Sequence, residues 1–365
     1  MAPSSSTDGP QVPRHSFAAA AGPLPDPVAR QVAAACRGGA EGPSILGLSF
    51  VSERYKTLQR DTEAALRRLL GIPEGFRVLF LSGGATAQFA AVPLNLLSGG
   101  RAVYVESGHW SRRAREEAGR YGVAIALAAD VVAEWAGWRA GPPPAYCHLT
   151  SNETADGVQF SDYPAVPVPL AVDMTSDFLT RRIDFDRVAL AYAGTQKSIG
   201  VSGLTLVIVR EDLLGRALPA TPRVLDYARQ AECDSRVNTP PVFAVFVLKA
   251  MLDWIEAQGG VSAMADNARR RSGAVYWAVD DNPALRAFVP PERRSRINPC
   301  FHLADPGDTA HFLAAAAAAG LDDLQGHPAL GGIRASLYNG LSEAAVTALV
   351  GFLDAYAPRV SARAA

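Results

Sequence analysis

The chain has 365 residues, of which 48% are hydrophobic and 19% are charged, and its formal net charge at pH 7 is −1. This charge excludes the strongly basic surface of a nucleic-acid-binding domain, and no window approaches the roughly 20 apolar residues of a membrane span. The length allows two packed domains.

The first two thirds of the chain predict an α/β architecture. Residues 1–14, rich in serine and proline, are typical of a disordered tail, so ordered sequence is expected from near Ser16. From residue 44 to about 261, short β-branched runs alternate with helical patterns, which predicts a mostly parallel sheet. The predicted strands are 77–81, 102–105, 145–148, 166–172 and 204–209, and the predicted helices are 61–70, 112–120 and 242–257.

A pair of glycines, Gly259-Gly260, predicts the joint between two domains. We expect a large domain at 15–261, whose first residues can pack against the second domain, and a small α+β domain at 262–365. Within the small domain the patterns predict helices at 263–279, 309–319 and 342–356 and a strand at 298–303.

The cysteines place the chain in a reducing compartment. Four of them are present, with neither CxxC nor metal-ligand spacing, so we expect reduced thiols and no metal site. No signal-peptide pattern is visible either, which favours a cytoplasmic location.

Two residues carry the strongest chemical signal. Lys197 lies among small residues directly before the predicted strand 204–209, and Asp173 lies at the carboxyl end of the apolar run 166–172. Ligands of open α/β sheets bind at such strand ends. A lysine that can form a Schiff base and an aspartate that can protonate a pyridine nitrogen are the minimum equipment of a pyridoxal phosphate (PLP) site. The alternatives are a structural lysine and a helix N-cap aspartate.

Three further segments suit the rest of such a site. The glycine turn 82–88 lies between a strand and a helix and can bind phosphate through backbone N–H groups. The sequence Gly108-His109-Trp110 offers an indole to a flat ring, although a lone tryptophan is more often part of a core. The turn 152–157 adds hydroxyl and amide groups, with an ordinary polar loop as the alternative.

These segments follow the order and spacing of a known family. From about Phe17 to the C-terminus the chain resembles phosphoserine aminotransferase, a fold-type I, class V PLP enzyme. The resemblance rests on blocks of sequence at 88–95, 152–154, 192–197, 203–214, 238–241 and 331–336. It implies a large domain with a mostly parallel seven-stranded sheet and a small α+β C-terminal domain.

The resemblance also implies residue roles. Lys197 would form the Schiff base with PLP, Asp173 would pair with the pyridine nitrogen, Trp110 would stack on the ring and Thr154 would reach the ring hydroxyl. The residues implied for the phosphate are Gln196, Ala85 and Thr86, with Asn238 and Thr239 from the second subunit. The active site would therefore require a homodimer.

The chain departs from the family at the substrate end. Phe50 and Val51 replace a His-Arg pair that binds the substrate phosphate or side-chain carboxylate, and a second His-Arg pair is reduced to His327-Pro328. Arg334 matches the family residue for the substrate α-carboxylate, which a guanidinium can bind through two hydrogen bonds. Each lost charge-assisted hydrogen bond is worth roughly 1.5–3 kcal/mol, so a dianion should bind much less well.

We therefore predict a PLP-dependent aminotransferase that acts on an altered, non-phosphorylated amino acid and 2-oxo acid. One alternative is true phosphoserine transamination between 3-phosphohydroxypyruvate and glutamate in serine biosynthesis, with Arg54 or Lys56 compensating for the lost pairs. Another is a noncatalytic PLP-binding scaffold, against which the intact set of cofactor residues argues. A class V desulfurase would need a mobile cysteine, and Cys147 and Cys300 lie in predicted strands.

Overall fold

The computed structural model of the chain describes residues 12–39, 42–132, 135 and 142–357. Residues 1–11 of the predicted tail lie outside this part. Arg14 donates a hydrogen bond from Nε to Asp322 Oδ2 at 2.9 Å. Strand β1 (His15–Ser16) then pairs in parallel with β13 (Leu321–Asp322), so the first described residues pack on the C-terminal part of the chain.

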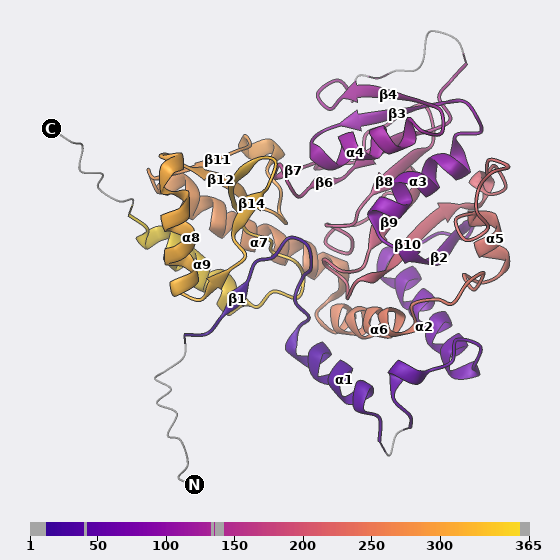
Figure 1. The fold of residues 1–365 in the computed structure, drawn as a ribbon, viewed down its shortest axis with the longest axis horizontal. Helices are drawn as coiled ribbons and strands as arrows, with labels where there is room; N and C mark the ends of the chain where they lie inside the picture. The colour runs from indigo at the N-terminus through magenta and orange to yellow at the C-terminus, as the bar shows by residue number, and fades with distance from the viewer. Residues whose placement is uncertain (1–11, 40–41, 133–134, 136–141, 358–365) are drawn as a thin grey trace.

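A seven-stranded sheet forms the centre of the larger lobe (Figure 1). Its strands, in spatial order, are β2 (Phe76–Gly83), β10 (Gly203–Arg210), β9 (Val188–Gly194), β8 (Leu170–Asp173), β5 (Cys147–Thr150), β3 (Arg101–Glu106) and β4 (Val123–Ala128). Only β10 runs antiparallel to its neighbours. The predicted α/β fold class with a mostly parallel seven-stranded sheet is confirmed.

One predicted strand starts later than expected. The strand predicted at 166–172 is β8, which begins at Leu170. Pro167 and Pro169 lie in the earlier part of that run and have no backbone N–H to give to a sheet ladder, so pairing begins only after them.

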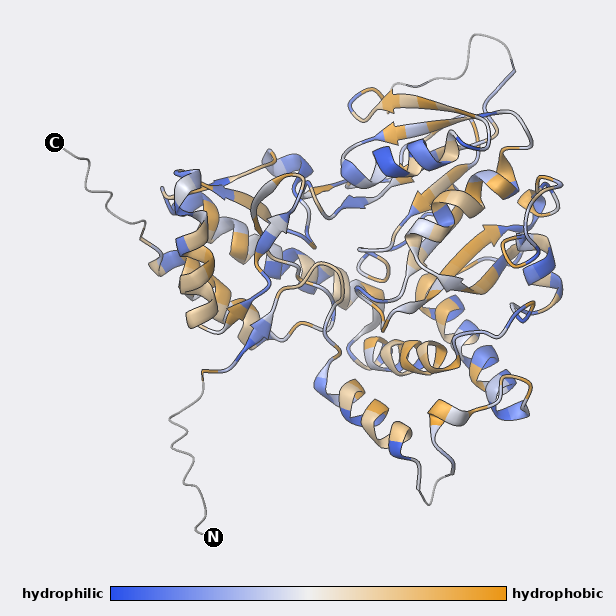
Figure 2. Cartoon of the chain, viewed as in Figure 1, coloured by the Kyte–Doolittle hydropathy of each residue, from blue (hydrophilic) through white to orange (hydrophobic). Residues whose placement is uncertain are grey.

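Helices cover both faces of the large sheet. Helices α2 (Glu53–Leu70) and α6 (Val242–Ala257) pack on the face that receives Val78 and Phe80, and α3 (Ala85–Leu96), α4 (His109–Ala118) and α5 (Tyr227–Glu232) pack on the face of Leu79. Successive side chains of β2 therefore point to opposite faces of the sheet, as expected for a strand that is buried on both faces. Figure 2 shows apolar residues gathered in the strands and in α6.

Capping explains why α2 is longer than the predicted 61–70. The helix starts at Glu53 because the Ser52 hydroxyl accepts a hydrogen bond from Tyr55 N at 3.3 Å. Helix α1 (Asp26–Arg37) precedes it and packs on α6 through Val28. A short hairpin of β6 (Asn152–Glu153) and β7 (Val158–Gln159) leaves the end of the large sheet.

The C-terminal part has its own sheet and core. Its four antiparallel strands are β11 (Leu285–Ala287), β12 (Cys300–Leu303), β15 (Gly331–Arg334) and β14 (Gln325–His327), in that spatial order. Its helices are α7 (Gly260–Asp281), α8 (Thr309–Ala318) and α9 (Glu343–Ala355). Phe301, Phe312 and Leu349 lie fully buried among these elements.

Helix α7 joins the two parts. Gly259 and Gly260 adopt φ values of 100° and 73° between α6 and α7, in the region that favours glycine. The first turns of α7 bury Val261 and Met264 in the core of the large sheet, and its last turns bury Val279 in the C-terminal core. Because α7 contributes to both cores, the boundary between two domains after residue 261 stays a prediction. Across the described ranges, no helix is long and apolar enough to cross a membrane.

Candidate active site

The carboxyl ends of β5 and β8, the turn after β9 and the start of α3 open into a cavity of about 340 Å³. This is the edge of a parallel sheet at which ligands bind. Its lining brings together these residues singled out from the sequence: Ala85, Thr86, Trp110, Thr154, Asp173, Gln196, Lys197, His327 and Arg334. It also includes Gly84 and Asn152, from the turns 82–88 and 152–157 that the sequence had indicated, and residues that sequence reasoning missed: Ala19, Ala20, Thr150, Thr175 and Ser176.

Lys197 lies in the turn between β9 and β10, with its Nζ 5.7 Å from the centroid of the Trp110 ring. Burial lowers the pKa of Lys197 to about 8, and the charge of Asp173 opposes this shift. A lysine of this kind has a useful fraction of neutral amine near neutral pH, which is the form that attacks a carbonyl or accepts a proton.

Asp173 ends β8, and 4% of its surface is exposed. Its Oδ1 accepts a hydrogen bond from Thr175 N at 2.9 Å. The residues after it form a turn and not a helix, so the helix N-cap reading does not apply. Burial raises the pKa of Asp173, while the hydrogen bonds from Thr175 and the charge of Lys197 hold it down. A cationic pyridine nitrogen would compensate such a buried carboxylate.

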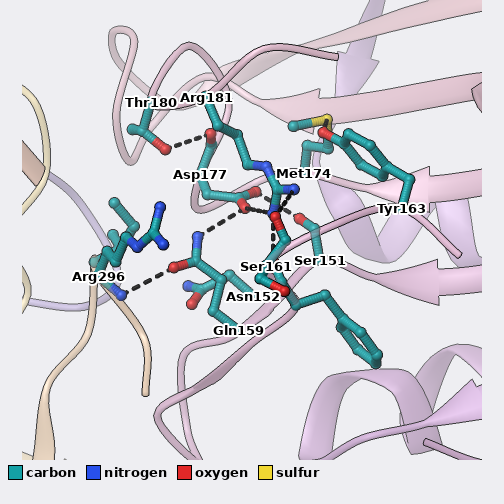
Figure 3. A network of polar contacts seen from close by, with 12 residues as sticks. Ser151, Asn152, Gln159, Ser161, Tyr163, Met174, Asp177, Thr180, Arg181 and Arg296 are labelled. Carbon is teal, nitrogen blue, oxygen red and sulfur yellow. Dashed lines mark hydrogen bonds and ion pairs between the residues drawn. The ribbon is translucent and has the colours of Figure 1, made fainter. Parts of the chain in front are cut away.

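A second buried carboxylate, Asp177, lies in a network of polar contacts with Ser151, Gln159 and Arg181 (Figure 3). Asp177 accepts hydrogen bonds from Ser151 Oγ and Gln159 Nε2, and Arg181 lies 4.0 Å away. Burial raises the pKa of Asp177, and Arg181 is the main group opposing that rise. Ser151 Oγ also lies 2.9 Å from the backbone oxygen of Asp173, so this network holds the end of β8 in place.

The turn 152–157 orients Trp110. Trp110 Nε1 donates to Thr154 Oγ1 at 2.9 Å, which joins the two residues predicted for the cofactor ring. Glu153 is fully buried and accepts from the backbone N–H groups of Trp110 and Ser111, each at 2.8 Å. Asp156 accepts from His109 N at 2.9 Å. Two distant carboxylates therefore cap the first turn of α4.

Burial raises the pKa of Glu153 to about 7, and the hydrogen bonds from Ser111 and Trp110 oppose this rise. Sequence reasoning treated 152–157 only as a source of hydroxyl and amide groups. The signal it passed over was the pair of acids three residues apart in a turn after a buried strand, a pattern able to bind a helix start.

The start of α3 suits a phosphate. Helix α3 begins at Ala85, and Gly84 is its N-cap residue. Because glycine has no side chain, the first N–H groups of the helix have no side-chain cap. Gly83 has φ 115°, and a Cβ there would lie 3.0 Å from Ala87 Cβ, so the turn requires glycine. N–H groups at an uncapped helix start attract anions.

The N-terminal segment closes one side of the cavity. Gly22 N donates to Gln196 O at 2.8 Å, and a Cβ on Gly22 would lie only 2.0 Å from Lys197 O. Tyr338 Oη donates to Ala19 O at 2.8 Å. Glycine at position 22 therefore permits the close approach that brings Ala19 and Ala20 to the site.

At the substrate end, Arg334 donates from Nη1 to Thr154 O at 3.0 Å. His327 Nδ1 accepts from Ala329 N at 3.2 Å. Burial lowers the pKa of His327, with His109 as the next cause, so this imidazole is neutral at pH 7.

Four residues singled out from the sequence lie outside the cavity lining of this chain. Phe50 packs partly buried against the core of the large sheet, and Val51 is 64% exposed. Asn238 donates to Ser82 Oγ at 3.4 Å, and Thr239 is exposed. If these residues act at a PLP site, that site is therefore not the cavity of their own chain.

The chemistry of the donors present fits PLP. Lys197 suits the aldehyde, Asp173 the ring nitrogen, Trp110 the ring face and the start of α3 the phosphate. In addition, Thr150 Oγ1 is buried and has no hydrogen-bond partner within the described part of the chain, so a bound polar group can satisfy it.

The fold, and a cavity lined by both Lys197 and Asp173, fit a PLP-dependent transferase of the aminotransferase class, and the family Aminotransferase class-V matches residues 16–349. Phosphoserine aminotransferase of Aromatoleum aromaticum is 41% identical, over 94% of this chain and 98% of that protein. Among solved structures, phosphoserine aminotransferase from Bacillus circulans subsp. alkalophilus has a TM-score of 0.86 at 36% identity, over 91% of this chain and 95% of its own.

The PLP-bound phosphoserine aminotransferase from Trichomonas vaginalis superimposes with a TM-score of 0.85 at 33% identity, over 93% of this chain and 99% of its own. The chain belongs to the phosphoserine aminotransferase family of class V, PLP-dependent aminotransferases. The family, the enzyme class and the cofactor predicted from the sequence are thereby confirmed.

Proposed function

We propose that the protein transfers an amino group between an amino acid and a 2-oxo acid that carries no phosphate. The observation that carries this proposal is the loss of basic residues at the substrate end, where Phe50, Val51 and Pro328 stand in place of family cations. An apolar pair cannot compensate a desolvated dianion, but it can bury side-chain carbons at about 25 cal/mol per Å².

The residues of the cavity have distinct roles in this reaction. When bound, PLP supplies the electron sink for transamination. Lys197 Nζ would hold the cofactor and would accept and return the substrate Cα proton. Asp173 would keep the ring nitrogen protonated, and Arg334 would orient the substrate through its α-carboxylate. Gln196, Ala85 and Thr86 would hold the phosphate, as the helix start allows.

The basic residues near Phe50 are already engaged, which supports the proposal. Lys56 Nζ donates to Glu53 Oε1 at 2.6 Å, and Arg54 Nη1 donates to Pro43 O at 3.3 Å. Compensation for the lost pairs by Arg54 or Lys56 would require these contacts to break.

We further infer a homodimer with shared active sites, and a cytoplasmic location. The exposure of Val51 and Thr239 supports the dimer, because residues that act only in a partner's cavity must reach the surface of their own subunit. An Asn238→Ala, Thr239→Ala double variant should lose PLP affinity while it stays folded. Unchanged PLP occupancy would show that each chain holds the phosphate alone.

The cysteines argue against desulfuration. Cys147 and Cys300 are buried in β5 and β12, and burial raises the pKa of each thiol to about 12. Neither they nor the more exposed Cys36 and Cys233 line the cavity. A thiol that acts on substrate must reach the cofactor as a thiolate, which the buried pair cannot do.

A substrate screen tests the proposal directly. Purified holoenzyme is mixed with single amino acids, and the conversion of the PLP absorbance to that of pyridoxamine phosphate is followed. The second half-reaction is then run with 2-oxo acids, 3-phosphohydroxypyruvate included. We expect a non-phosphorylated acid to be the best acceptor.

Two outcomes would favour other functions. Conversion of 3-phosphohydroxypyruvate as fast as any other acceptor would support phosphoserine transamination, the activity in the names of the relatives that are about 40% identical. No conversion with any donor would favour a noncatalytic PLP-binding protein.

A further inference from the structure

A histidine and a tyrosine lie fully buried on the large sheet beside Asp173, outside the cavity lining. His148 on β5 and Tyr192 on β9 meet across the strand between them, with His148 Nε2 2.9 Å from Tyr192 Oη. That strand, β8, places Ala171 opposite His148 and Asp173 opposite Tyr192. Because residues two apart on a strand share a face, Asp173 points to the same face as this pair.

The surroundings of His148 determine which of its nitrogens carries the proton. Burial lowers the pKa of His148 to about 3, so the imidazole is neutral at pH 7 and has a single N–H group. Its Nδ1 is buried and has no hydrogen-bond partner within the described part of the chain. A buried N–H without an acceptor is rarer in proteins than an unfilled acceptor, so the proton is on Nε2. His148 therefore donates to Tyr192 Oη.

The hydroxyl proton of Tyr192 is then free for another acceptor, and Asp173 is that acceptor. Burial raises the pKa of Tyr192, and Asp173 raises it further through its charge and a side-chain hydrogen bond. A hydrogen bond that raises the pKa of a tyrosine is one in which the neutral hydroxyl donates. The donors thus run in one direction, from His148 to Tyr192 and from Tyr192 to Asp173, whose Oδ1 also accepts from Thr175 N.

We propose that Tyr192, held by His148, is a positioning residue for Asp173 and keeps the ring proton on the PLP nitrogen instead of on the aspartate. This inference rests on the role proposed for Asp173. A carboxylate that accepts a hydrogen bond is stabilised in its ionised form and has a lower proton affinity. The ring nitrogen opposite it then retains its proton, and a protonated ring is the stronger electron sink.

Nitrogen-15 NMR of the holoenzyme, loaded with PLP that is labelled at the ring nitrogen, tests this inference apart from turnover. Tyr192→Phe deletes one oxygen atom, and of His148→Leu and His148→Gln only the second keeps an N–H donor. Tyr104→Phe is the matched control for the loss of a buried hydroxyl. The Tyr104 ring stacks on His148 at 4.8 Å between centroids, but its hydroxyl is hydrogen-bonded to that of Tyr146.

We expect the nitrogen signal of Tyr192→Phe to move toward that of an unprotonated pyridine. The rate of conversion to pyridoxamine phosphate at saturating amino acid should fall about tenfold, with little change in the half-saturating concentration, because one hydrogen bond to a charged group is lost. His148→Leu should shift the signal less in the same direction, and His148→Gln should restore it. Tyr104→Phe should lose stability and keep the wild-type signal.

The inference is overturned if Tyr192→Phe keeps the wild-type signal, if Tyr104→Phe shifts it as far, or if leucine and glutamine at position 148 act alike. A wild type whose ring nitrogen is already unprotonated would overturn the role of Asp173 and this inference with it. A wild type that shows the expected signals but converts no phosphate-free acid would contradict the proposed function alone.

Discussion

The two ends of the cavity are built in different ways. At the cofactor end, Asp173, Thr154 and Glu153 are buried, and Trp110 Nε1 and Ser111 N, both distant in the sequence, donate hydrogen bonds to Thr154 and Glu153. At the substrate end, His327 and Arg334 are only partly buried, and His327 has one described hydrogen bond, to a residue two positions away. A change at the buried end leaves polar groups unsatisfied, whereas a change at the exposed end costs little folding energy.

This difference explains why the cofactor is easier to assign than the substrate. The cofactor end can change only together with its supporting network, so it resembles the family closely. The substrate end can exchange a basic pair for Phe50 and Val51 without loss of fold.

The largest effect is expected at Lys197. Lys197→Ala removes both the covalent attachment of PLP and the proton acceptor, so amino transfer should fall by about 10⁴-fold. Stopped-flow measurement of pyridoxamine phosphate formation gives the rate. Lys249→Ala is the control, because Lys249 is bound to Asp253 at 2.7 Å on α6 and should be dispensable. A Lys197→Ala enzyme within tenfold of the wild type would exclude Lys197 as the reacting lysine.

The exposed end should accept a change of specificity. The triple change Phe50→His, Val51→Arg and Pro328→Arg should raise kcat/KM for 3-phosphohydroxypyruvate about 10- to 100-fold relative to the native substrate, because it restores charge-assisted hydrogen bonds. Steady-state kinetics with both acceptors measures the ratio.

Phe50→Leu with Val51→Ile controls for altered bulk and should leave that ratio unchanged. If the wild type already uses the phosphorylated acceptor efficiently and the triple change adds nothing, the altered-specificity proposal is wrong.

Changes in the hydrogen-bond network around Trp110 should affect folding stability more than catalytic activity. Glu153→Gln leaves one of the two buried N–H groups, of Trp110 or Ser111, without an acceptor, which should cost about 1–3 kcal/mol of unfolding free energy. Urea unfolding of the holoenzyme measures this. Glu256→Gln, on the exposed end of α6, is the control and should be nearly neutral. Equal stability of both variants would show that the cap of α4 is unimportant.

The smallest effect concerns pH. Burial lowers the pKa of Lys197 to about 8. The fraction of Lys197 in the neutral amine form should therefore increase about tenfold per pH unit below pH 8 and then level off. The rate of PLP attachment to the apoenzyme, followed by absorbance, should show the same plateau. A rate that climbs to pH 10 would indicate an unperturbed lysine.

The same shift has a consequence for stability. Between pH 8 and the ordinary lysine value of 10.5, the unfolded chain binds more protons than the folded chain. The apoenzyme should therefore gain stability as the pH rises through this window, and lose that contribution as the pH falls toward 8.

Local patterns were sufficient for much of the fold. Helix α6 occupies the predicted 242–257. The chemistry of Lys197 and Asp173 could be inferred because Lys197 lies among small residues just before an apolar run, and Asp173 ends one, and both runs become buried strands. Some errors lie at element ends, where prolines or a capping serine decide the boundary, as at the starts of β8 and α2. Two strands of the large sheet, β4 and β9, were not predicted from local patterns.

The sequence by itself therefore determined the α/β fold class and the family, since these depend on residue type and spacing along the chain. Only the tertiary structure decided that Glu153 caps α4, that Gly22 brings Ala19 to the cavity, and that the rings of His109 and His327 lie side by side. Those contacts join segments far apart in the chain. Their geometry depends on how the helices and the two sheets pack, which local propensity does not specify.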